Sequence, residues 1–500
     1  MHPLLKTRFA PSPTGRLHLG NIRTALFNWL LARRHGGAFL LRLEDTDAMR
    51  DHEKYAVALQ EDLRWMGLVW DEGPGVGGAH GPYAQSERGE IYKSHFLKLE
   101  QDGLAYPCFC TEHELAVERK TAIAAHRPPR YSGKCRALSA DDVRARFGRG
   151  EPATLRFRVP DDSRDGGRSG LLPSRGTTPS LEGGGTTSGK VAAARKVSFN
   201  DKVRGPQAFD SADIGDFVIR RSDGTPAFFF CNAIDDALMG VTLVVRGEDH
   251  LSNTPRQILL LEALGLPAPE YAHIALVVDA DGAPLSKRTG SQSVEELRAA
   301  GYLPAALHNY LARLGHTYED NAFLSLETLA AGFAAERLHR APARYDESQL
   351  KHWQREAVLH VPAATLWAWM GDEVHRRVPA ANRDGFIEAA RGNLLSPPDA
   401  LHWAQALFGA DINLDHAAND IVRVAGAGFF AAALKALETQ GTDFKALTET
   451  LKAATGKTGK ALFQPLRAAL TGELDGPEMA KLLPLMGVER ARARLAKYAK

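Results

Sequence analysis

The sequence predicts an α/β fold that is interrupted by an insertion and followed by an all-α region. Three observations support this. A strand, a Pro/Gly-rich loop, a helix and a second strand follow one another over residues 6–43, which is the order of a βαβ crossover. The character of the sequence changes near Tyr106. Beyond about Thr317 no strand pattern remains, and Ala, Leu and Arg recur at helical spacing.

The loop from Pro11 to Asn21 reads PSPTGRLHLGN, and Asn21 is expected to be the N-cap of the helix that follows. One face of that helix is apolar: Ile22, Ala25, Leu26 and Trp29. A helix N-terminus attracts anions, Gly15 and Gly20 let the backbone approach a ligand, and His18 can donate to a phosphoryl oxygen. The loop is therefore predicted to bind a nucleotide; the alternative is an ordinary turn with a surface histidine.

Length and composition set broad limits on the protein. A chain of 500 residues exceeds the size of one hydrophobic core, so two or more domains are expected. Its formal net charge of +2 neither requires nor excludes a nucleic-acid partner, because basic patches are local. Lys6 and Arg8 interrupt the first apolar residues, and no run approaches the ~18 apolar residues of a membrane span. We expect a cytoplasmic protein.

Acidic residues follow the second strand, which is expected at Phe39 to Leu43. Glu44, Asp45 and Asp47 lie at its carboxyl end, the edge where open α/β sheets bind ligands. A carboxylate there can hold an ammonium group, although a solvated acidic turn is the alternative. The next apolar residues recur at helical spacing up to Gly67, which indicates a crossover helix.

Three of the four cysteines are close in sequence, at Cys108, Cys110 and Cys135. This pattern suits a metal in a reducing compartment better than a disulfide framework, although a structural zinc site normally has four ligands. Three small buried residues are the alternative. Residues 161–195 are rich in Gly, Ser, Thr and Arg without aromatics, which predicts a flexible surface insertion.

A second α/β segment begins near Asp216. Ser222, Asp223 and Gly224 form a predicted hairpin turn between FVIRR and an apolar run that ends at Phe230. A strand over 241–245 delivers Arg246, which can pair a carboxylate, and a helix entered through Asn253 and Pro255 follows. One more strand is expected over 273–278. It precedes the exposed loop 283–290, where Lys287 suits a polyphosphate.

Five separated motifs carry a family resemblance: RFAPSPTGRLHLGN at 8–21, LLRLEDTD at 40–47, GPYAQSER at 81–88, VVRGEDHLSNTPRQ at 244–257 and LSKR at 285–288. Together they resemble the glutamyl-tRNA synthetases, class I aminoacyl-tRNA synthetases of bacterial type with HIGH and KMSKS signatures. The resemblance implies a Rossmann-like catalytic domain with an inserted α+β acceptor-binding domain and an all-α anticodon-binding region. The implied segments are 1–105 and 201–272 (catalytic halves), 106–200 (insertion), 273–335 (stem-contact region with the KMSKS-like loop) and 336–500 (anticodon-binding region).

The resemblance also implies the reaction and its residues. A monomeric ligase would join L-glutamate to tRNA(Glu) through glutamyl-adenylate, with ATP and Mg²⁺ and without a side-chain nucleophile. His18 and Lys287 are the implied catalytic residues. The implied ATP-binding residues are Pro11, Ser12, Pro13, Thr14, Gly15, His18, Gly20, Asn21, Leu285, Ser286, Lys287 and Arg288. The implied glutamate-binding residues are Arg8, Ala10, Ser12, Glu44, Phe228, Asn232 and Arg246.

The family pattern suggests a fourth zinc ligand and shows two departures. Tyr131, four residues before Cys135, is the expected ligand, with His113 as a substitute. Phe228 stands where relatives usually have a tyrosine, so a hydroxyl group is missing from the amino-acid pocket. Pro284 replaces a lysine, which leaves the activating charge mainly to Lys287.

Four alternatives remain open from the sequence. In the first alternative, the enzyme charges tRNA(Gln) as well as tRNA(Glu). In the second, the chain is a tRNA-binding paralogue with reduced activity. A smaller relative that modifies a tRNA base lacks the roughly 180 residues after Thr317, which argues against it. A glutaminyl-tRNA synthetase is expected to have a β-rich anticodon region, and the sequence has no such pattern.

Overall fold

The computed structural model describes residues 4–46, 52–126, 129–160, 195–285 and 292–500, and the chain divides into two compact units. The first unit comprises Met1–Glu295 and Leu311–Tyr345, and the second comprises Glu296–Tyr310 and Asp346–Lys500. In the described residues the first unit is α/β and the second is helical, which confirms the predicted fold class.

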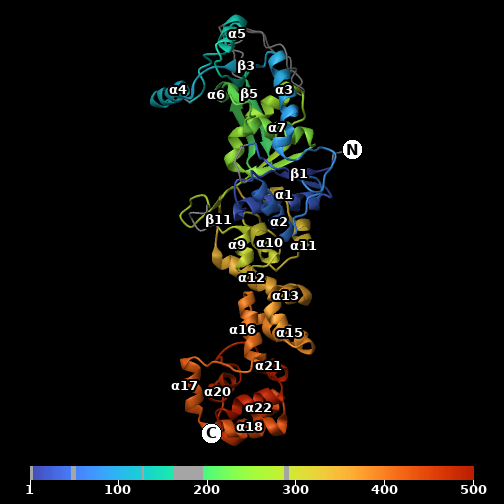
Figure 1. The fold of residues 1–500 in the computed structure, drawn as a ribbon, viewed down its shortest axis with the longest axis vertical. Helices are drawn as coiled ribbons and strands as arrows, with labels where there is room; N and C mark the ends of the chain where they lie inside the picture. The colour runs from blue at the N-terminus through green and yellow to red at the C-terminus, as the bar shows by residue number, and fades with distance from the viewer. Residues whose placement is uncertain (1–3, 47–51, 127–128, 161–194, 286–291) are drawn as a thin grey trace, which may run out of the picture. The chain divides into compact units, whose positions relative to one another are not determined.

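Figure 1 shows the elements of the first unit in blue, green and yellow. Its strands are β1 (Lys6–Phe9), β2 (Ala38–Leu41), β3 (Ala105–Cys108), β4 (Thr154–Phe157), β5 (Lys196–Asp201), β6 (Gly205–Asp210), β7 (Phe217–Arg220), β8 (Leu243–Gly247), β9 (Glu270–Ile274), β10 (Val277–Val278) and β11 (Ala343–Arg344). Its main helices are α1 (Leu19–Arg34), α2 (His52–Trp65), α3 (Gly89–Gln101), α4 (Glu112–Ala124), α5 (Ala140–Gly148), α6 (Ser211–Ile214), α7 (Phe228–Leu238), α8 (Thr254–Leu264) and α11 (Leu326–Gly332).

Parallel strands from two distant segments meet in this unit. β1 pairs with β2 in parallel, and β8 pairs with β9, which is joined to β5. β1 lies beside β8, because the Lys6 N–H donates to Thr242 Oγ1 (2.8 Å) and the Thr242 N–H donates to the Lys6 carbonyl (2.9 Å). The carboxyl ends of β1, β2 and β8 therefore share one edge, where α/β sheets bind ligands. β3, β4 and β7 form a separate antiparallel sheet.

The two segments also share a hydrophobic core. The four apolar residues predicted for α1 are buried: Ile22, Ala25 and Leu26 are 0% exposed and Trp29 is 8% exposed. A second cluster joins Leu40 of β2 to Val244 of β8, Phe230 of α7 and Leu259 of α8. Because fully burying such a side chain contributes about 1.5–3 kcal/mol, this shared core fixes the strands that carry the site.

Three local features differ from the sequence-based expectations. The N-cap of α1 is His18 and not Asn21 as expected. The helix begins at Leu19, so Gly20 and Asn21 already belong to it. The apolar run after the turn at 222–224 is not extended: Pro226 closes an antiparallel bridge to Arg220, and α7 starts at Phe228. The strand expected over 273–278 is divided into β9 and β10, and β10 pairs with β11, beyond the point where strands were expected to end.

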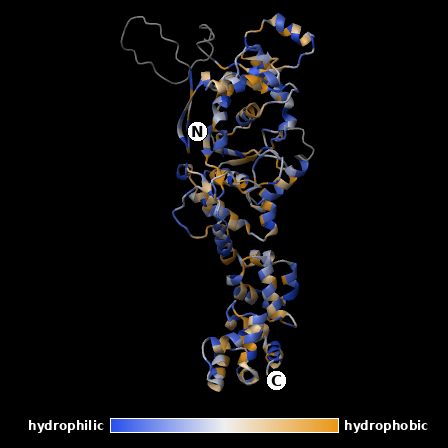
Figure 2. Cartoon of the chain, turned by 90° about the vertical axis from the view of Figure 1, so that its left-hand side faces the viewer, coloured by the Kyte–Doolittle hydropathy of each residue, from blue (hydrophilic) through white to orange (hydrophobic). Residues whose placement is uncertain are grey.

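The second unit consists of helices in its described part. They are α12 (Glu347–His360), α13 (Ala363–Met370), α14 (Asp372–Arg377), α15 (Arg383–Ala390), α16 (Pro397–Phe408), α17 (His416–Ala425), α18 (Ala427–Gln440), α19 (Phe444–Thr455), α20 (Lys460–Thr471), α21 (Met479–Met486) and α22 (Val488–Ala496). α9 (Val294–Ala299) and α10 (Pro304–Arg313) cross the division between the units. Figure 2 shows orange and blue residues interleaved along these helices, as in amphipathic helices that bury one face. No described helix is long and apolar enough to cross a membrane.

Candidate active site

The predicted nucleotide loop leads directly into the N-terminus of α1. The backbone of His18 is extended, and its carbonyl accepts the first helical hydrogen bond from the Ile22 N–H at 3.0 Å. Gly20 lies in the first turn, where an added Cβ atom would meet no atom within 4 Å. The first N–H groups of α1 therefore have open space in front of them for an anion.

A cleft of about 630 Å³ runs along this loop and across the shared edge of β1, β2 and β8. Its volume is in the usual range for a small-molecule site. The predicted residues that line it are Arg8, Ala10, Pro11, Ser12, Thr14, Gly15, His18, Gly20, Asn21, Glu44, Phe228, Asn232, Arg246 and Leu285. Pro13 is buried and does not line the cleft. Ser286, Lys287 and Arg288 lie outside the described residues.

Two buried arginines enter the cleft from neighbouring strands. Arg8 of β1 donates through Nε to Asp236 Oδ1 (3.1 Å), while Arg246 of β8 donates to Thr254 Oγ1 (2.9 Å) and Gln257 Oε1 (2.7 Å). The Nε of Arg246 lies 3.2 Å from the ring of His273. Burial and the nearby charge of Arg8 lower the pKa of Arg246 to about 10, so its guanidinium stays charged at neutral pH. Both cations are therefore held for an anionic ligand.

A buried carboxylate faces the same cleft. Glu44 follows β2, is 7% exposed, and accepts a hydrogen bond from Arg42 Nη2 at 3.4 Å. Burial raises its pKa to about 7, although Arg42 and Arg8 oppose the shift. Asn232 of α7 lies beside it and accepts from the same Arg42 atom at 3.0 Å. Glu44 is thus a buried acidic group in a lining that also contains the cations Arg8 and Arg246.

The two departures from the family pattern also lie at the cleft. The Phe228 ring is partly exposed and stacks on His250, with ring centroids 5.3 Å apart. Pro284 bridges Val278, and the Leu285 N–H donates to the Val277 carbonyl at 2.8 Å. These contacts hold the backbone of Pro284 and Leu285 beside the cleft, which both residues line.

Sequence reasoning missed the charged residues behind the cleft. Arg42 lies inside the apolar stretch LLRL, and Asp235 and Asp236 lie inside the apolar helix α7. All three are at most 2% exposed. Charged residues within apolar elements are almost never fully buried unless they are paired, and this signal would have indicated them.

Comparisons with known proteins agree with this arrangement. Residues 4–168 and 187–352 match the family of tRNA synthetases class I (E and Q), catalytic domain, and residues 414–499 match an anticodon binding domain. The chain is 56% identical over 491 residues to glutamate–tRNA ligase 2 of Nitrosococcus oceani, covering 98% of this chain and 97% of that protein. It is 52% identical to glutamate–tRNA ligase 2 of Alkalilimnicola ehrlichii, covering 98% and 97% of the two chains.

The chain belongs to the glutamate–tRNA ligase family. A solved structure agrees with this: the glutamate tRNA ligase of Elizabethkingia meningosepticum, in complex with its amino acid, is 28% identical and superposes with a TM-score of 0.82. The match covers 99% of this chain and 98% of that one.

A cluster of three thiols lies at the end of β3 and in the segment that follows it. The Sγ atoms of Cys108, Cys110 and Cys135 all lie within 4.8 Å of one another. The Tyr131 hydroxyl lies 3.4 Å from the Sγ of Cys108 and 3.6 Å from that of Cys110. The exposed His113 is not part of the cluster. The geometry therefore favours Tyr131 over His113 as a fourth group.

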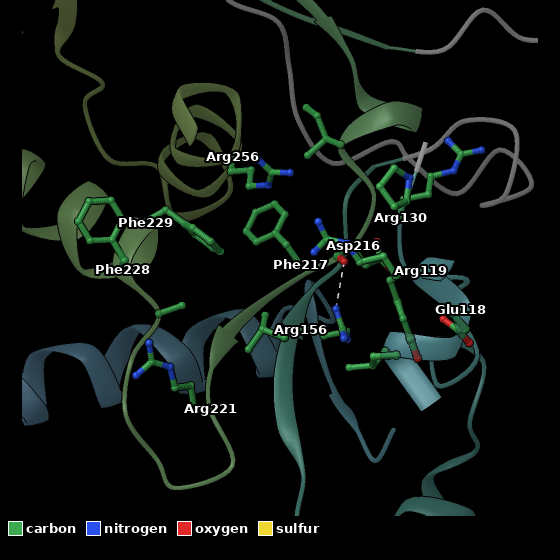
Figure 3. Close-up of a pocket in the computed structure, with 16 residues that line it drawn as sticks. Glu118, Arg119, Arg130, Arg156, Asp216, Phe217, Arg221, Phe228, Phe229 and Arg256 are labelled. Atoms are coloured by element: carbon green, nitrogen blue, oxygen red, sulfur yellow. Dashed lines mark hydrogen bonds between the residues drawn. The ribbon is translucent and has the colours of Figure 1, made fainter. Parts of the chain in front are cut away.

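A second cavity, of about 500 Å³, is lined by residues of α4, β4, β7, α7 and α8 (Figure 3). Five arginines line it: Arg119, Arg130, Arg156, Arg221 and Arg256. Phe217 and Phe229 add aromatic rings, and Phe228 lines both this cavity and the cleft. In a tRNA synthetase, arginines and aromatic rings are the groups that hold phosphates and stack on bases.

Proposed function

We propose that this protein ligates L-glutamate to the 3′ end of tRNA(Glu) through a glutamyl-adenylate intermediate. One observation carries the proposal: Arg8, Arg246 and Glu44 line one cleft beside the N-terminus of α1. Two cations and one anion match the two carboxylates and the ammonium of a dicarboxylic amino acid. The helix N-terminus matches the phosphates of ATP.

In the first step an oxygen of the glutamate α-carboxylate attacks the α-phosphorus of ATP. The bond between the α-phosphorus and the bridging oxygen breaks, and pyrophosphate leaves with that electron pair. The protein supplies in-line positioning and charge stabilisation rather than a nucleophile. We infer that His18 and the first N–H groups of α1 stabilise the phosphoryl oxygens, because the N-terminus of α1 lines the same cleft as Arg8.

Mg²⁺ enters this step as part of the MgATP substrate and neutralises phosphate charge. Lys287, together with Ser286 and Arg288, is proposed to hold the departing pyrophosphate. This assignment comes from the family motif and from Leu285, the preceding residue, which lines the cleft.

In the second step the terminal adenosine 2′-hydroxyl of the tRNA attacks the glutamyl carbonyl carbon. The hydroxyl proton is lost, AMP leaves, and an ester bond forms. We place the acceptor strand along the arginine-lined cavity, because Phe228 joins that cavity to the cleft where the adenylate forms. Phosphates need cationic neighbours, and this cavity provides five.

We propose that Cys108, Cys110, Cys135 and Tyr131 hold one structural Zn²⁺. Three thiols and a hydroxyl converge on a common point, and the Arg156 guanidinium, 3.9 Å from the Tyr131 ring centroid, offsets the negative charge of thiolates. Elemental analysis is expected to find one zinc per chain in the wild type and none after Cys110→Ser and Cys135→Ser. A metal-free wild type with full charging activity would exclude this site.

Pyrophosphate exchange and charging assays test the proposed function. We expect glutamate-dependent exchange in the presence of tRNA, and glutamyl transfer to purified tRNA(Glu). Parallel charging of tRNA(Gln) decides whether that tRNA is a second substrate. Absence of glutamate-dependent exchange with and without tRNA would contradict the proposal. The monomeric state and the cytoplasmic location stay predictions.

A further inference from the structure

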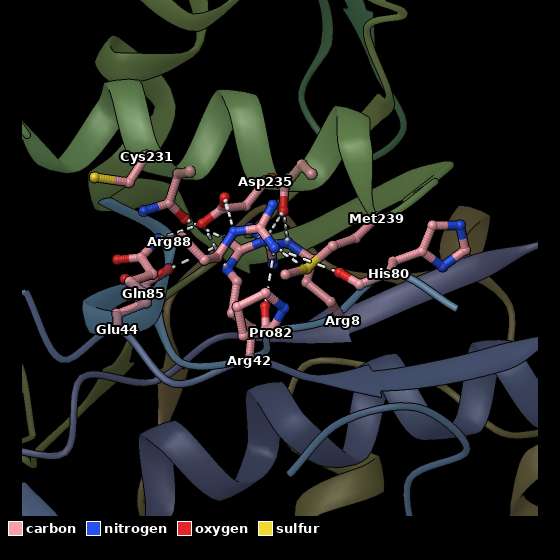
Figure 4. Close-up of polar contacts among 12 residues, drawn as sticks. Arg8, Arg42, Glu44, His80, Pro82, Gln85, Arg88, Cys231, Asp235 and Met239 are labelled. Carbon is pink, nitrogen blue, oxygen red and sulfur yellow. Dashed lines mark hydrogen bonds and ion pairs between the residues drawn. The ribbon is translucent and has the colours of Figure 1, made fainter. Parts of the chain in front are cut away.

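Figure 4 shows buried polar and charged side chains gathered around Arg42, and three of them, Arg8, Glu44 and Asn232, also line the cleft. We call this group the Arg42 cluster, and it consists of Arg8, Arg42, Glu44, Asn232, Asp235 and Asp236. Arg42 lies at its centre and is 0% exposed. Arg42 is not among the residues that line the cleft, so it does not reach the substrate directly.

Arg42 contacts three groups that orient the cleft wall. Its Nη1 donates to Asp236 Oδ1 at 2.7 Å, and its Nη2 donates to Asn232 at 3.0 Å and to Glu44 at 3.4 Å. Asp236 Oδ1 also accepts from Arg8 Nε at 3.1 Å. One guanidinium therefore links Arg8, Glu44 and Asn232, three of the residues proposed to contact glutamate.

The charges of the cluster show why a second arginine is needed there. Asp235 is paired by Arg88 at 2.7 Å and accepts from Gln85 and Tyr92, so the longer contact with Arg42 Nε at 3.7 Å adds little to the compensation of its charge. Asp236 is shared between Arg8 and Arg42. Although burial disfavours its charged form, these two arginines lower the pKa of Asp236 below its ordinary value. Without Arg42, the charge of Asp236 would be neutralised by Arg8 alone.

We propose that Arg42 is a positioning residue that sets the preference for glutamate over glutamine. By neutralising Asp236 it leaves the positive charge of Arg8 for the substrate, so that the charges of Arg8, Arg246 and deprotonated Glu44, the three charged groups proposed to contact glutamate, sum to +1. That charge complements glutamate, whose net charge is −1, and not glutamine, which is neutral. The inference rests on glutamate being the amino-acid substrate.

The test compares variants of the full-length protein in pyrophosphate exchange with saturating tRNA. Arg42→Met removes the charge and is expected to raise the KM for glutamate about 30-fold or more, with the KM for ATP changed less than about threefold. L-Glutamine is the probe of selectivity: its inhibition constant, divided by the KM for glutamate, is expected to fall by about tenfold or more. Arg42→Lys keeps the charge but not the forked geometry, so it should raise the KM for glutamate and preserve this ratio.

A charge-balanced double variant separates the proposed role from loss of folding. Arg42→Met with Asp236→Asn removes both charges of one pair, and we expect the ratio to return to within about threefold of the wild-type value. Arg494→Met is the matched control, since Arg494 is 1% exposed and bonds backbone carbonyls in the second unit. It should lower the melting temperature without changing the ratio.

An unchanged ratio in Arg42→Met, or an equal rise in both KM values, would overturn the proposed role of Arg42. If Arg42→Met does not fold, the double variant and Arg42→Lys carry the test, and loss of glutamate preference in both would overturn it. Failure of the wild type to exchange with glutamate would instead contradict the proposed function.

Discussion

At the scale of single residues, Glu44 links burial to a measurable pH dependence. Burial raises its pKa to about 7, with Arg42, Arg8 and Asp236 as its charged neighbours. Its deprotonated form is the one that holds an ammonium. We therefore expect the KM for glutamate to rise as the pH falls from about 8 to about 6. The KM for ATP over the same pH series is the control, and Glu44→Gln should abolish the dependence.

The raised pKa of Glu44 affects stability in the opposite direction: a lower pH weakens glutamate binding but stabilises the fold. The folded state binds the Glu44 proton more tightly than the unfolded chain does, because the pKa is raised from 4.5 to about 7. The contribution of Glu44 to the free energy of unfolding therefore increases as the pH falls from about 7 towards about 4.5.

A KM for glutamate that does not change with pH would show that Glu44 is not the ammonium-binding group.

Phe228 allows a gain-of-function test. Its ring lines the cleft and is 37% exposed, so a hydroxyl group added to it has room beside the substrate. A hydrogen bond to a charged group contributes about 1.5–3 kcal/mol, which corresponds to roughly tenfold or more in affinity. We expect Phe228→Tyr to lower the KM for glutamate by about that factor in pyrophosphate exchange. An unchanged KM would mean that water or His250 already supplies this hydrogen bond.

Single residues differ in how well the sequence predicts them. Arg8, Glu44 and Arg246 follow predicted strands, so their place at a shared sheet edge can be argued from the sequence. The ion pair between Arg42 and Asp236 cannot be argued from the sequence. It joins residues 194 positions apart and depends on how α7 packs against β2. Lys287 was predicted from its motif and lies outside the described residues.

At the scale of elements, the start of α1 makes a prediction through Gly20. Glycine is unfavourable in helices, yet an added Cβ would meet no protein atom here, so protein packing does not require glycine. Because Gly20 lines the cleft, we expect Gly20→Ala to keep or raise the melting temperature and to raise the KM for ATP by about fivefold. Gly428 is the matched control: it is also the second residue of a helix, also has open space, and does not line the cleft. An unchanged KM for ATP in Gly20→Ala would contradict the role of this turn.

Elements with long periodic patterns were predictable and short ones were not. The helical spacing of α1 extends over 16 residues and makes it recognisable, and the four-residue strands β1 and β2 were expected from their place on either side of it. The run FFFC at 228–231 suits a buried strand or a helix equally, and Pro226 decides for the helix by closing the preceding bridge. β10 and β11 have two residues each, which is too short for any pattern.

At the scale of the whole molecule, two reaction steps are assigned to two cavities of the first unit. On the proposed function, the groups for adenylate formation line the cleft, and those for the acceptor strand line the arginine-lined cavity. Phe228 lines both, so under this proposal the adenylate would form next to the acceptor strand. Substitutions in the second cavity should therefore raise the KM for tRNA and leave the KM values for glutamate and ATP unchanged.

Arg256 tests this division. It belongs to α8, its Nη1 donates to the Ser252 carbonyl at 2.7 Å, and burial lowers its pKa, so it is an anchored cation facing the cavity. We expect Arg256→Gln to raise the KM for tRNA on the order of fivefold and to reduce the salt dependence of tRNA binding by about one phosphate group. The KM values for glutamate and ATP should stay unchanged at saturating tRNA.

Arg64→Gln is the control for this variant, because Arg64 is an exposed arginine that lines neither cavity. Arg256 does not line the cleft, so its substitution removes no group that faces ATP. Equal changes in all three KM values would therefore mean that the two cavities do not act separately.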